Sequence, residues 1–358
     1  MAATNGHTRT LKPGVWAPIP TFYDDEENLD LDTFRKHVVK LAKVGMQPVI
    51  CGSMGEGFHL SDDERFTLFK ETRKALDEAG LHDTVFIAGT GGNSTRQTIR
   101  VSKLAAEAGA DIAIVIPPGY YAGALPKPAL KQFFLDVQEA SPIPVMIYNF
   151  PGAAGGIDMD SDLINSIALE GSNICGVKLT CGAVGKLTRI TGKTSIFENG
   201  EKEKDSSNSK SFSTKYPRKN KNLAPEFLTL GGFADFMAPA IIGGKGNGAI
   251  MGLGNIYPRS LVKLFELCEK IVNSTEPSSE DLKKALNLQD LVSEADASFT
   301  RGGIAGTKYF LQKNNGHPNR RMRRPILDFT DEAGNSLEKE DGVTGLLAYE
   351  KALEKESQ

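Results

Sequence analysis

The strongest constraint on the fold is a regular alternation of short apolar runs with amphipathic stretches. The runs are rich in β-branched residues, and most are continuously apolar, as expected of parallel strands covered on both faces. Eight such runs cover residues 15–22, 47–53, 84–91, 111–118, 144–151, 174–180, 227–233 and 248–255. Helical periodicity covers residues 31–44, 61–78, 94–108, 128–139 and 257–272. This order predicts βα units around a parallel sheet.

Eight strands with helices between them predict an α/β protein with a (β/α)8 TIM barrel. A length of 358 residues accommodates one such barrel of roughly 250 residues and an appendage. The alternative is a doubly wound open sheet. That fold favours a GxGxxG motif after the first strand, and the segment PIPTFYDDEEN contains none.

The expected domain organisation is a barrel followed by a small helical region. We expect an N-terminal tail at 1–14, the barrel at 15–272, a C-terminal helical region at 273–334 and a charged tail at 335–358. Residues 192–222 are polar and rich in Lys, Ser and Asn, where a short loop should join the sixth helix to the seventh strand. We interpret them as a disordered surface insertion.

The composition argues against several classes of protein. A formal net charge of −3 offers no attraction to nucleic acid or to an anionic membrane, and no apolar run is long enough to span a bilayer. The 4 cysteines form no CxxC pair, and the first residues lack the apolar run of a secretory signal. We therefore expect a cytoplasmic protein whose partners are small molecules.

Two common kinds of cofactor site are also disfavoured. The 5 histidines are scattered without HxH or HExxH spacing, so we expect no metal. The one GKT triplet, residues 192–194, lies in the polar insertion rather than after a strand, so it does not predict a phosphate-binding loop.

The most informative residue is Lys178, in the middle of the apolar run ICGVKLT. Strand alternation puts it on one face with Gly176 and Thr180, and Cys175, Val177 and Leu179 on the other face, against the helices. Lys178 should therefore point into the barrel, where burial disfavours the charged ammonium and the neutral amine can form a Schiff base with a ketone. A lysine in a buried ion pair is the alternative.

Tyr148, in PVMIYNFPG, is the second candidate. Alternation puts Met146 and Tyr148 inward and Val145 and Ile147 outward. A phenol near the carboxyl end of a barrel strand lies where catalytic groups of this fold occur, and it can transfer protons. Simple packing of a buried tyrosine is the alternative.

The third candidate is the glycine-rich segment CGSMGEGFHLSDDER that follows the second run. Its glycines allow close approach of the backbone to a ligand, and the amides of Ser53 and Met54 could bind a carboxylate. An ordinary turn is the alternative. We expect Ser61 and Glu64 to form a capping box there.

Four motifs together, GSMGE at 52–56, PPGYY at 117–121, YNFPG at 148–152 and GVKLT at 176–180, resemble one family in order and spacing. It is the dihydrodipicolinate synthase and N-acetylneuraminate lyase family of Schiff-base aldolases. The resemblance extends from about residue 15 to residue 326 and is interrupted by the insertion. It implies a pyruvate-dependent carbon-carbon lyase that uses a covalent lysine imine and no metal or other cofactor.

The resemblance also implies roles for single residues. Lys178 would form the imine, Tyr148 would be the general acid and base, and Ser53 would relay protons to it. The amides of Ser53 and Met54 would hold the carboxylate of pyruvate. Tyr121 matches a tyrosine that reaches across a dimer interface to complete the neighbour's relay, so a homodimer or homotetramer is implied. The matches to positions that line the pocket near the imine are Gly232 and Ile250.

Departures from the family pattern bear on the substrate. Ala153 stands where dihydrodipicolinate synthases carry an arginine, and Ser53-Met54 replaces their Thr-Thr pair. The chain is more similar to the fungal branch of 2-keto-3-deoxy-sugar-acid aldolases and 4-hydroxy-2-oxoglutarate aldolase-like proteins. We therefore expect reversible cleavage of a hydroxylated 2-oxo acid to pyruvate and an aldehyde. The alternatives are dihydrodipicolinate synthase activity and a non-catalytic ligand-binding relative.

Overall fold

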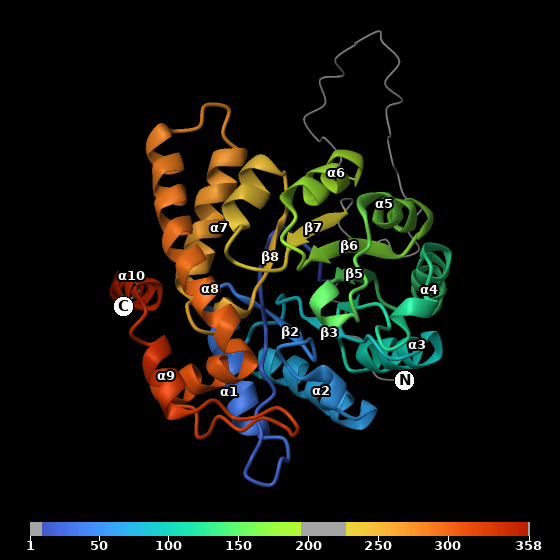
Figure 1. The fold of residues 1–358 in the computed structure, drawn as a ribbon, viewed down its shortest axis with the longest axis horizontal. Coiled ribbons are helices and arrows are strands. Elements are labelled where there is room, and N and C mark those ends of the chain that lie inside the picture. Colours follow the sequence, from blue (N-terminus) through green and yellow to red (C-terminus); the bar gives the residue numbers. More distant parts are fainter. Residues whose placement is uncertain (1–8, 195–226, 357–358) are drawn as a thin grey trace.

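The computed structural model describes residues 9–194 and 227–356. Eight parallel strands close into a barrel in sequence order, with β1 paired to both β2 and β8 (Figure 1). They are β1 (Gly14–Pro18), β2 (Gln47–Ile50), β3 (Ile87–Gly89), β4 (Ile112–Val115), β5 (Val145–Asn149), β6 (Ile174–Leu179), β7 (Leu228–Gly231) and β8 (Gly248–Ile250). The predicted (β/α)8 barrel is confirmed, and the open sheet is excluded because the barrel is closed.

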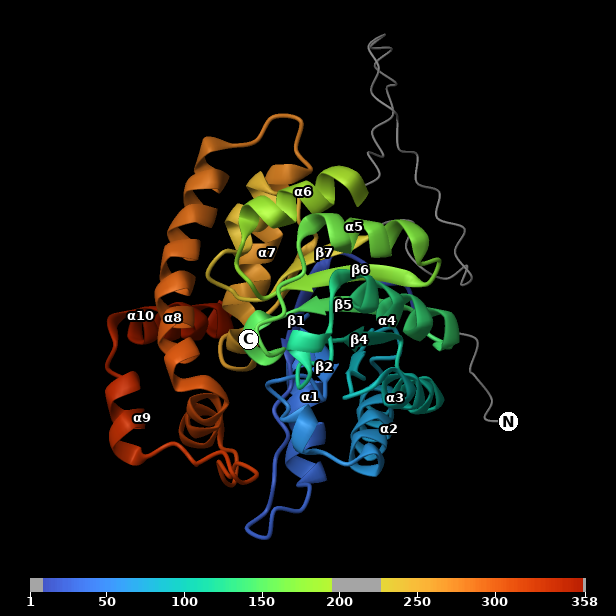
Figure 2. The same ribbon diagram turned by 45° about the vertical axis from the view of Figure 1, so that its right-hand side comes forward.

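Helices cover the outside of the barrel (Figure 2). They are α1 (Leu31–Lys43), α2 (Asp62–Glu78), α3 (Thr95–Glu107), α4 (Lys127–Ala140), α5 (Ser161–Glu170), α6 (Val184–Thr194) and α7 (Pro258–Val272). Short helices lie in the loops: η1 (Gly57–His59), η2 (Ala122–Ala124), η3 (Pro151–Ala153), η4 (Pro239–Gly243) and η5 (Gly252–Asn255). The capping box of α2 is present as predicted, with Ser61 and Glu64 each accepting the other's backbone amide.

The polar insertion lies mostly outside the described residues. Its first three residues, Gly192, Lys193 and Thr194, are the exception, because they form the last turn of α6. The GKT triplet is therefore helical rather than part of a loop. The apolar face of α6 explains the difference, since Ile190, Thr191 and Thr194 are buried against the barrel and carry the helix beyond the predicted boundary.

Strand alternation sorts the side chains into an inner and an outer layer. Val145, Ile147, Val177 and Leu179 pack with residues of α4 and α5, whereas Met146 and Tyr148 pack with Trp16 in a separate cluster. Cys175 is in that second cluster, although the sequence predicts that it faces the helices. The reason is a register shift, since Val145 pairs with Ile174 but Met146 pairs with Gly176, and this leaves Cys175 as an extra residue.

A C-terminal helical region packs beside the barrel. It contains α8 (Ser279–Asn315), α9 (Asp331–Leu337) and α10 (Asp341–Glu356). Helix α8 breaks at Gly303, whose φ of 59° is favourable for glycine. The helical character of this part agrees with the helical region predicted at 273–334.

The segment interpreted as a charged tail contains a complete helix, α10, which packs against α7 and α8. Val343 and Leu346 are buried, and both oxygens of Glu350 accept backbone amides at the first turn of α7, from Arg259 and Ser260. Apart from the buried Glu350, most of the charges that suggest a tail therefore lie on the outer face of a docked helix. In the described part of the chain, no helix has the length and apolarity needed to cross a bilayer.

Candidate active site

Lys178 lies near the carboxyl end of β6 and points into the barrel mouth, as the strand alternation predicts. Its side chain is buried, and its Nζ lies 3.3 Å from the hydroxyl oxygen of Tyr148 and 4.4 Å from the centre of the tyrosine ring. The described residues place no carboxylate in ion-pair contact with this amine. The structure therefore does not support the alternative that Lys178 belongs to a buried ion pair. Its amine is free to react with a ligand in the barrel mouth.

Tyr148 reaches Lys178 because the two residues are direct partners in the β5–β6 ladder. Its ring is buried and stacks on Phe150, with ring centres 5.7 Å apart. The strand and the stacking together fix the direction of the phenol. A hydroxyl held this close to the amine can give a proton to, or take one from, a group attached to Nζ.

The loop after β2 brings backbone amides to the same end of the barrel. Cys51 has a φ of 56°, so the chain turns sharply as it leaves the strand. Neither the amide of Ser53 nor that of Met54 donates a hydrogen bond to a described group. Two such amides in one tight loop form a site suited to a carboxylate.

The turn is close-packed, and its own thiol is unreactive. A Cβ on Gly89 would lie 2.2 Å from the Cys51 carbonyl oxygen, so only glycine fits at that position of β3. Burial raises the pKa of the Cys51 thiol to about 12, which leaves it un-ionised near neutral pH. The cysteine at this site is therefore structural.

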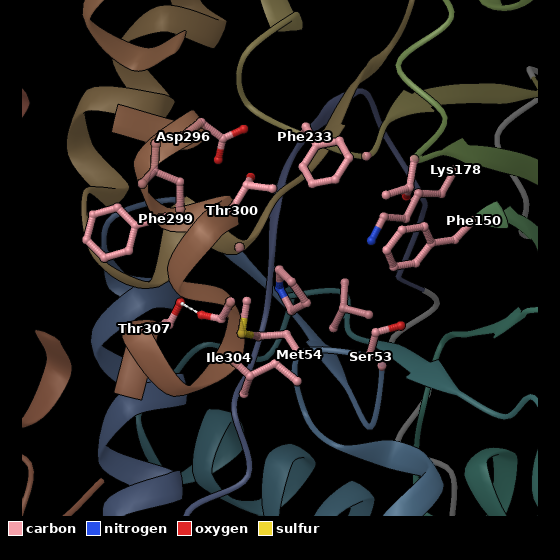
Figure 3. Close-up of a pocket in the computed structure, with 18 of the residues that line it drawn as sticks. Ser53, Met54, Phe150, Lys178, Phe233, Asp296, Phe299, Thr300, Ile304 and Thr307 are labelled. Carbon is pink, nitrogen blue, oxygen red and sulfur yellow. Dashed lines mark hydrogen bonds between the residues drawn. The ribbon is translucent and has the colours of Figure 1, made fainter. Parts of the chain in front are cut away.

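Lys178, Tyr148 and part of the loop after β2 line a cavity of about 290 Å³ at the carboxyl ends of the strands. Five predicted site residues meet there: Lys178, Tyr148, Ser53, Met54 and Gly232. Figure 3 shows Lys178, Phe150 and Ser53 on one side of this cavity, and Asp296, Phe299, Thr300 and Thr307 on the other. The mouth of a barrel at the carboxyl ends of its strands is where (β/α)8 enzymes carry out their chemistry.

Two of the predicted site residues, Ile250 and Tyr121, are not among the residues that line this cavity. Ile250 is the last residue of β8 and is fully buried in the cluster that contains Trp16, whereas Gly252, two residues further along, lines the cavity. Tyr121 is 68% exposed and its ring contacts only that of Tyr120 among described aromatic rings. A role for Tyr121 at an interface is a prediction that a single chain does not test.

Gly232 and Thr180 form the wall above Lys178. A Cβ on Gly232 would lie 2.1 Å from the Thr180 Oγ1, so the close approach of β7 to β6 requires glycine here. The Thr180 hydroxyl is buried and has no hydrogen-bond partner among the described residues. A substrate oxygen bound in the cavity would supply that partner.

The residues that sequence reasoning missed come from α8. Asp296, Thr300 and Thr307 line the cavity from this helix, which is outside the barrel in sequence. One signal was present: Asp296 interrupts the apolar stripe of Val292, Ala295 and Phe299, all of which are buried. An acidic residue inside such a stripe is uncommon without a specific partner or role.

The Asp296 carboxyl has an unusual environment. Its Oδ2 accepts the backbone amides of Ala234 and Asp235, at 2.9 and 3.1 Å. Burial, with the nearby Asp235 carboxylate second, raises the pKa of Asp296 to about 7. The carboxyl can therefore be protonated or ionised near neutral pH.

Fold and cavity together define a (β/α)8 barrel with a buried, unpaired lysine beside a tyrosine at the catalytic face. Residues 12–202 match the model of the dihydrodipicolinate synthetase family. The chain belongs to this family, as the sequence motifs predict.

The sequence is similar to that of fungal proteins over nearly the whole chain. The L-threo-3-deoxy-hexylosonate aldolase of Aspergillus niger is 37% identical, over 96% of this chain and 97% of the relative. A protein of Emericella nidulans named "Probable 4-hydroxy-2-oxoglutarate aldolase, mitochondrial" is also 37% identical, over 97% of this chain and 98% of its own length. Among solved structures, a dihydrodipicolinate synthase family protein from Coccidioides immitis superposes with a TM-score of 0.75 at 31% identity, covering 96% of this chain and 98% of that one.

Proposed function

We propose that this protein is a Schiff-base aldolase that reversibly cleaves a hydroxylated 2-oxo acid to pyruvate and an aldehyde. The observation that carries the proposal is the Lys178 amine, buried in a cavity, unpaired with any described carboxylate, and 3.3 Å from the hydroxyl of Tyr148. The names of the two relatives, both aldolases, support it.

In the proposed reaction, Nζ of Lys178 attacks C2 of the 2-oxo acid and one Nζ proton passes to the former carbonyl oxygen, which gives a carbinolamine. Tyr148 gives this oxygen a second proton, the oxygen leaves as water, and a protonated imine and a phenolate remain. Tyr148 then takes the proton of the C4 hydroxyl while the C3–C4 bond breaks and the aldehyde leaves. The electron pair of that bond moves into the protonated imine and forms an enamine. Tyr148 gives the proton taken from the C4 hydroxyl to C3, which restores the protonated imine. One water then adds at C2 and returns a proton to Tyr148, and collapse of the carbinolamine releases pyruvate and the neutral amine.

The loop after β2 would hold the carboxylate next to the reacting carbonyl. The free amides of Ser53 and Met54 are the donors for this carboxylate, and the Ser53 hydroxyl relays protons to Tyr148. The imine acts as the electron sink, so the proposal includes no metal and no other cofactor.

The second product is an aldehyde such as glyceraldehyde or glyoxylate. Dihydrodipicolinate synthase activity is the less favoured alternative. Its aldehyde substrate, aspartate semialdehyde, carries a carboxylate, and no arginine is among the described residues that line the cavity. Faster condensation of aspartate semialdehyde with pyruvate than cleavage of hydroxylated 2-oxo acids would reverse this preference.

Two further parts of the proposal concern the whole protein. We expect a homodimer or homotetramer in which the exposed Tyr121 meets a second copy, and light scattering on the purified protein tests this. We also expect the cytoplasm as the compartment, although the name of the Emericella nidulans relative includes the word mitochondrial. Imaging of the full-length chain with a C-terminal fluorescent tag tests the compartment.

Trapping of the imine is the central experiment. The protein is incubated with pyruvate, reduced with borohydride, and digested for peptide mass spectrometry. A lactyl-type mass increase is expected on Lys178 and on neither of two other buried lysines, Lys186 and Lys308, which are ion-paired with Asp158 and Glu56. Absence of an adduct from a folded protein would overturn the aldolase proposal and favour a non-catalytic binding relative.

A further inference from the structure

The cavity has a second wall, opposite Lys178, that the proposed chemistry at C2 to C4 does not use. It is formed by Asp296, Thr300 and Thr307 of α8, together with the apolar side chains of Phe299 and Ile304 (Figure 3). We call Asp296 and Thr300 the distal polar pair. A substrate attached to Lys178 through C2 and held at its carboxylate by the loop after β2 extends its remaining carbons toward this wall.

The charges around the cavity restrict what that part of the substrate can be. Among the described lining residues, only Lys178 and Asp296 have side chains that can carry a charge. In the protonated imine, the positive charge of Lys178 lies at C2, next to the carboxylate held by the loop after β2. No other described cation lines the cavity to bind a second carboxylate, and an ionised Asp296 would repel one.

The distal polar pair is suited to hydroxyl groups instead. The Oδ2 of Asp296 is fixed by the amides of Ala234 and Asp235, while its Oδ1 has no hydrogen-bond partner among the described residues. The hydroxyl of Thr300, one helical turn further along, likewise has no hydrogen-bond partner among the described residues. A hydroxyl both donates and accepts, so it can pair with a carboxyl in either protonation state and with a threonine.

We propose that Asp296, with Thr300, is a specificity determinant that binds the hydroxyls of an uncharged polyhydroxylated tail and disfavours a dicarboxylic substrate. The chain would then prefer a 2-oxo-3-deoxy sugar acid over 4-hydroxy-2-oxoglutarate. This inference rests on the proposed aldolase function and assigns its selectivity to a helix outside the barrel. A site built to hydrogen-bond hydroxyls discriminates strongly against ligands that lack them, because its own polar groups are then left unpaired.

The test compares two substrates on matched variants of the full-length protein. Cleavage of L-threo-3-deoxy-hexylosonate and of 4-hydroxy-2-oxoglutarate is measured as pyruvate release, and kcat/KM is determined for each. The variant Asp296→Asn keeps an oxygen for the amides of Ala234 and Asp235 but removes the acid. Thr300→Val keeps the shape of an exposed side chain and removes the hydroxyl. The control is Glu294→Gln, an exposed acid on the same helix that does not line the cavity.

The wild-type protein is expected to favour the sugar acid at least tenfold. We expect Asp296→Asn to lower kcat/KM for the sugar acid by about tenfold and Thr300→Val by about threefold, which are the losses expected for a single hydrogen bond. Neither change should lower the value for the dicarboxylic acid, and Glu294→Gln should leave both values unchanged. The signature is a change in the ratio between the two substrates, which a merely structural role would not move.

Two results would overturn the inference. One is a wild-type preference for the dicarboxylic acid, and the other is an equal loss for both substrates in Asp296→Asn. Borohydride trapping of pyruvate on Lys178, measured in every variant, keeps this failure separate from failure of the aldolase proposal. If the adduct forms and selectivity does not follow Asp296, only the inference fails; if no adduct forms, the proposed function fails as well.

Discussion

Lys178 and Lys308 are both buried, and their surroundings differ in one decisive respect. Lys308 of α8 is 1% exposed, and its Nζ lies 2.6 Å from Oε1 of Glu56 and 2.7 Å from the carbonyl oxygen of Arg321. Lys178 of β6 is 6% exposed, and its one described hydrogen-bond partner is the neutral hydroxyl of Tyr148. Burial alone therefore does not identify a reactive lysine; what distinguishes it is burial without a compensating carboxylate.

The partner of Lys308 lies in the loop that borders the cavity. Glu56 lies in the glycine-rich loop that provides the amides of Ser53 and Met54, and its second oxygen accepts the amide of Arg323. Lys308 thus anchors this loop to the C-terminal region. Lys178 forms no such anchor, and it is the lysine that we propose reacts with the substrate.

The largest expected effect is on catalysis. Lys178→Arg keeps a positive charge but cannot form the imine, so kcat for pyruvate release should fall by at least about 10³-fold while the protein stays folded. The measurement is the lactate dehydrogenase-coupled rate, with thermal unfolding as the control for folding. Substantial residual activity in Lys178→Arg would mean that the reaction does not pass through this amine.

The next effect is on stability. Lys308→Met removes one partner of a buried ion pair and leaves Glu56 uncompensated, so the free energy of unfolding should fall by about 3–5 kcal/mol. Chemical denaturation measures the loss. Lys186→Met is a useful comparison, because its partner Asp158 is half exposed, with 50% side-chain accessibility, and can be solvated by water. A loss for Lys186→Met as large as that for Lys308→Met would show that burial of the carboxylate is not what matters.

A smaller effect tests whether the two members of the pair are coupled. Glu56→Gln combined with Lys308→Met removes both charges together, so the double variant should be about 1–3 kcal/mol more stable than the sum of the two single losses predicts. A double-mutant cycle from denaturation curves gives the coupling energy. Additive losses would mean that the lysine and the glutamate act independently of each other.

The smallest effect concerns a buried acid without a counter-charge. The pKa of Asp296 is raised from 3.8 to about 7, so between these values the folded state binds more protons than the unfolded state, and stability contributed by this group falls as the pH rises. Asp296→Asn should therefore gain stability relative to the wild type as the pH is raised from 6 to 7, by at most about 1.4 kcal/mol over that one pH unit. Unfolding curves at both pH values measure this gain, and a difference between the two proteins that does not change with pH would contradict the raised pKa.

The barrel and the candidate catalytic residues could be predicted from the sequence because both depend on local pattern. A strand has a period of two, so one lysine in an apolar run fixes its own orientation once the strand is recognised. The same argument placed Tyr148 and Met146 inward, and the structure agrees with both. It failed at Cys175, because a shift in register depends on the neighbouring strand rather than on the strand's own residues.

Helix α10 was missed for a related reason. Its apolar face is narrow, with Val343 and Leu346 buried among charged neighbours, and the local pattern resembles a solvated tail. Docking against α7, through the carboxylate of Glu350 at the first turn of that helix, is what gives the segment a place in the fold.

The order of residues alone was enough to predict the eight-stranded barrel, the family and the inward lysine, since hydrophobic periodicity and short motifs are properties of neighbouring positions. The wall of the cavity formed by α8 and the anchoring of the loop were decided by tertiary structure. Lys308 and Glu56 are 252 positions apart, and Asp296 is 62 positions from the amide of Ala234 that holds it. Contacts over such separations form only when the closed barrel and the helices beside it fix the distance between them, and no local pattern in the chain specifies that distance.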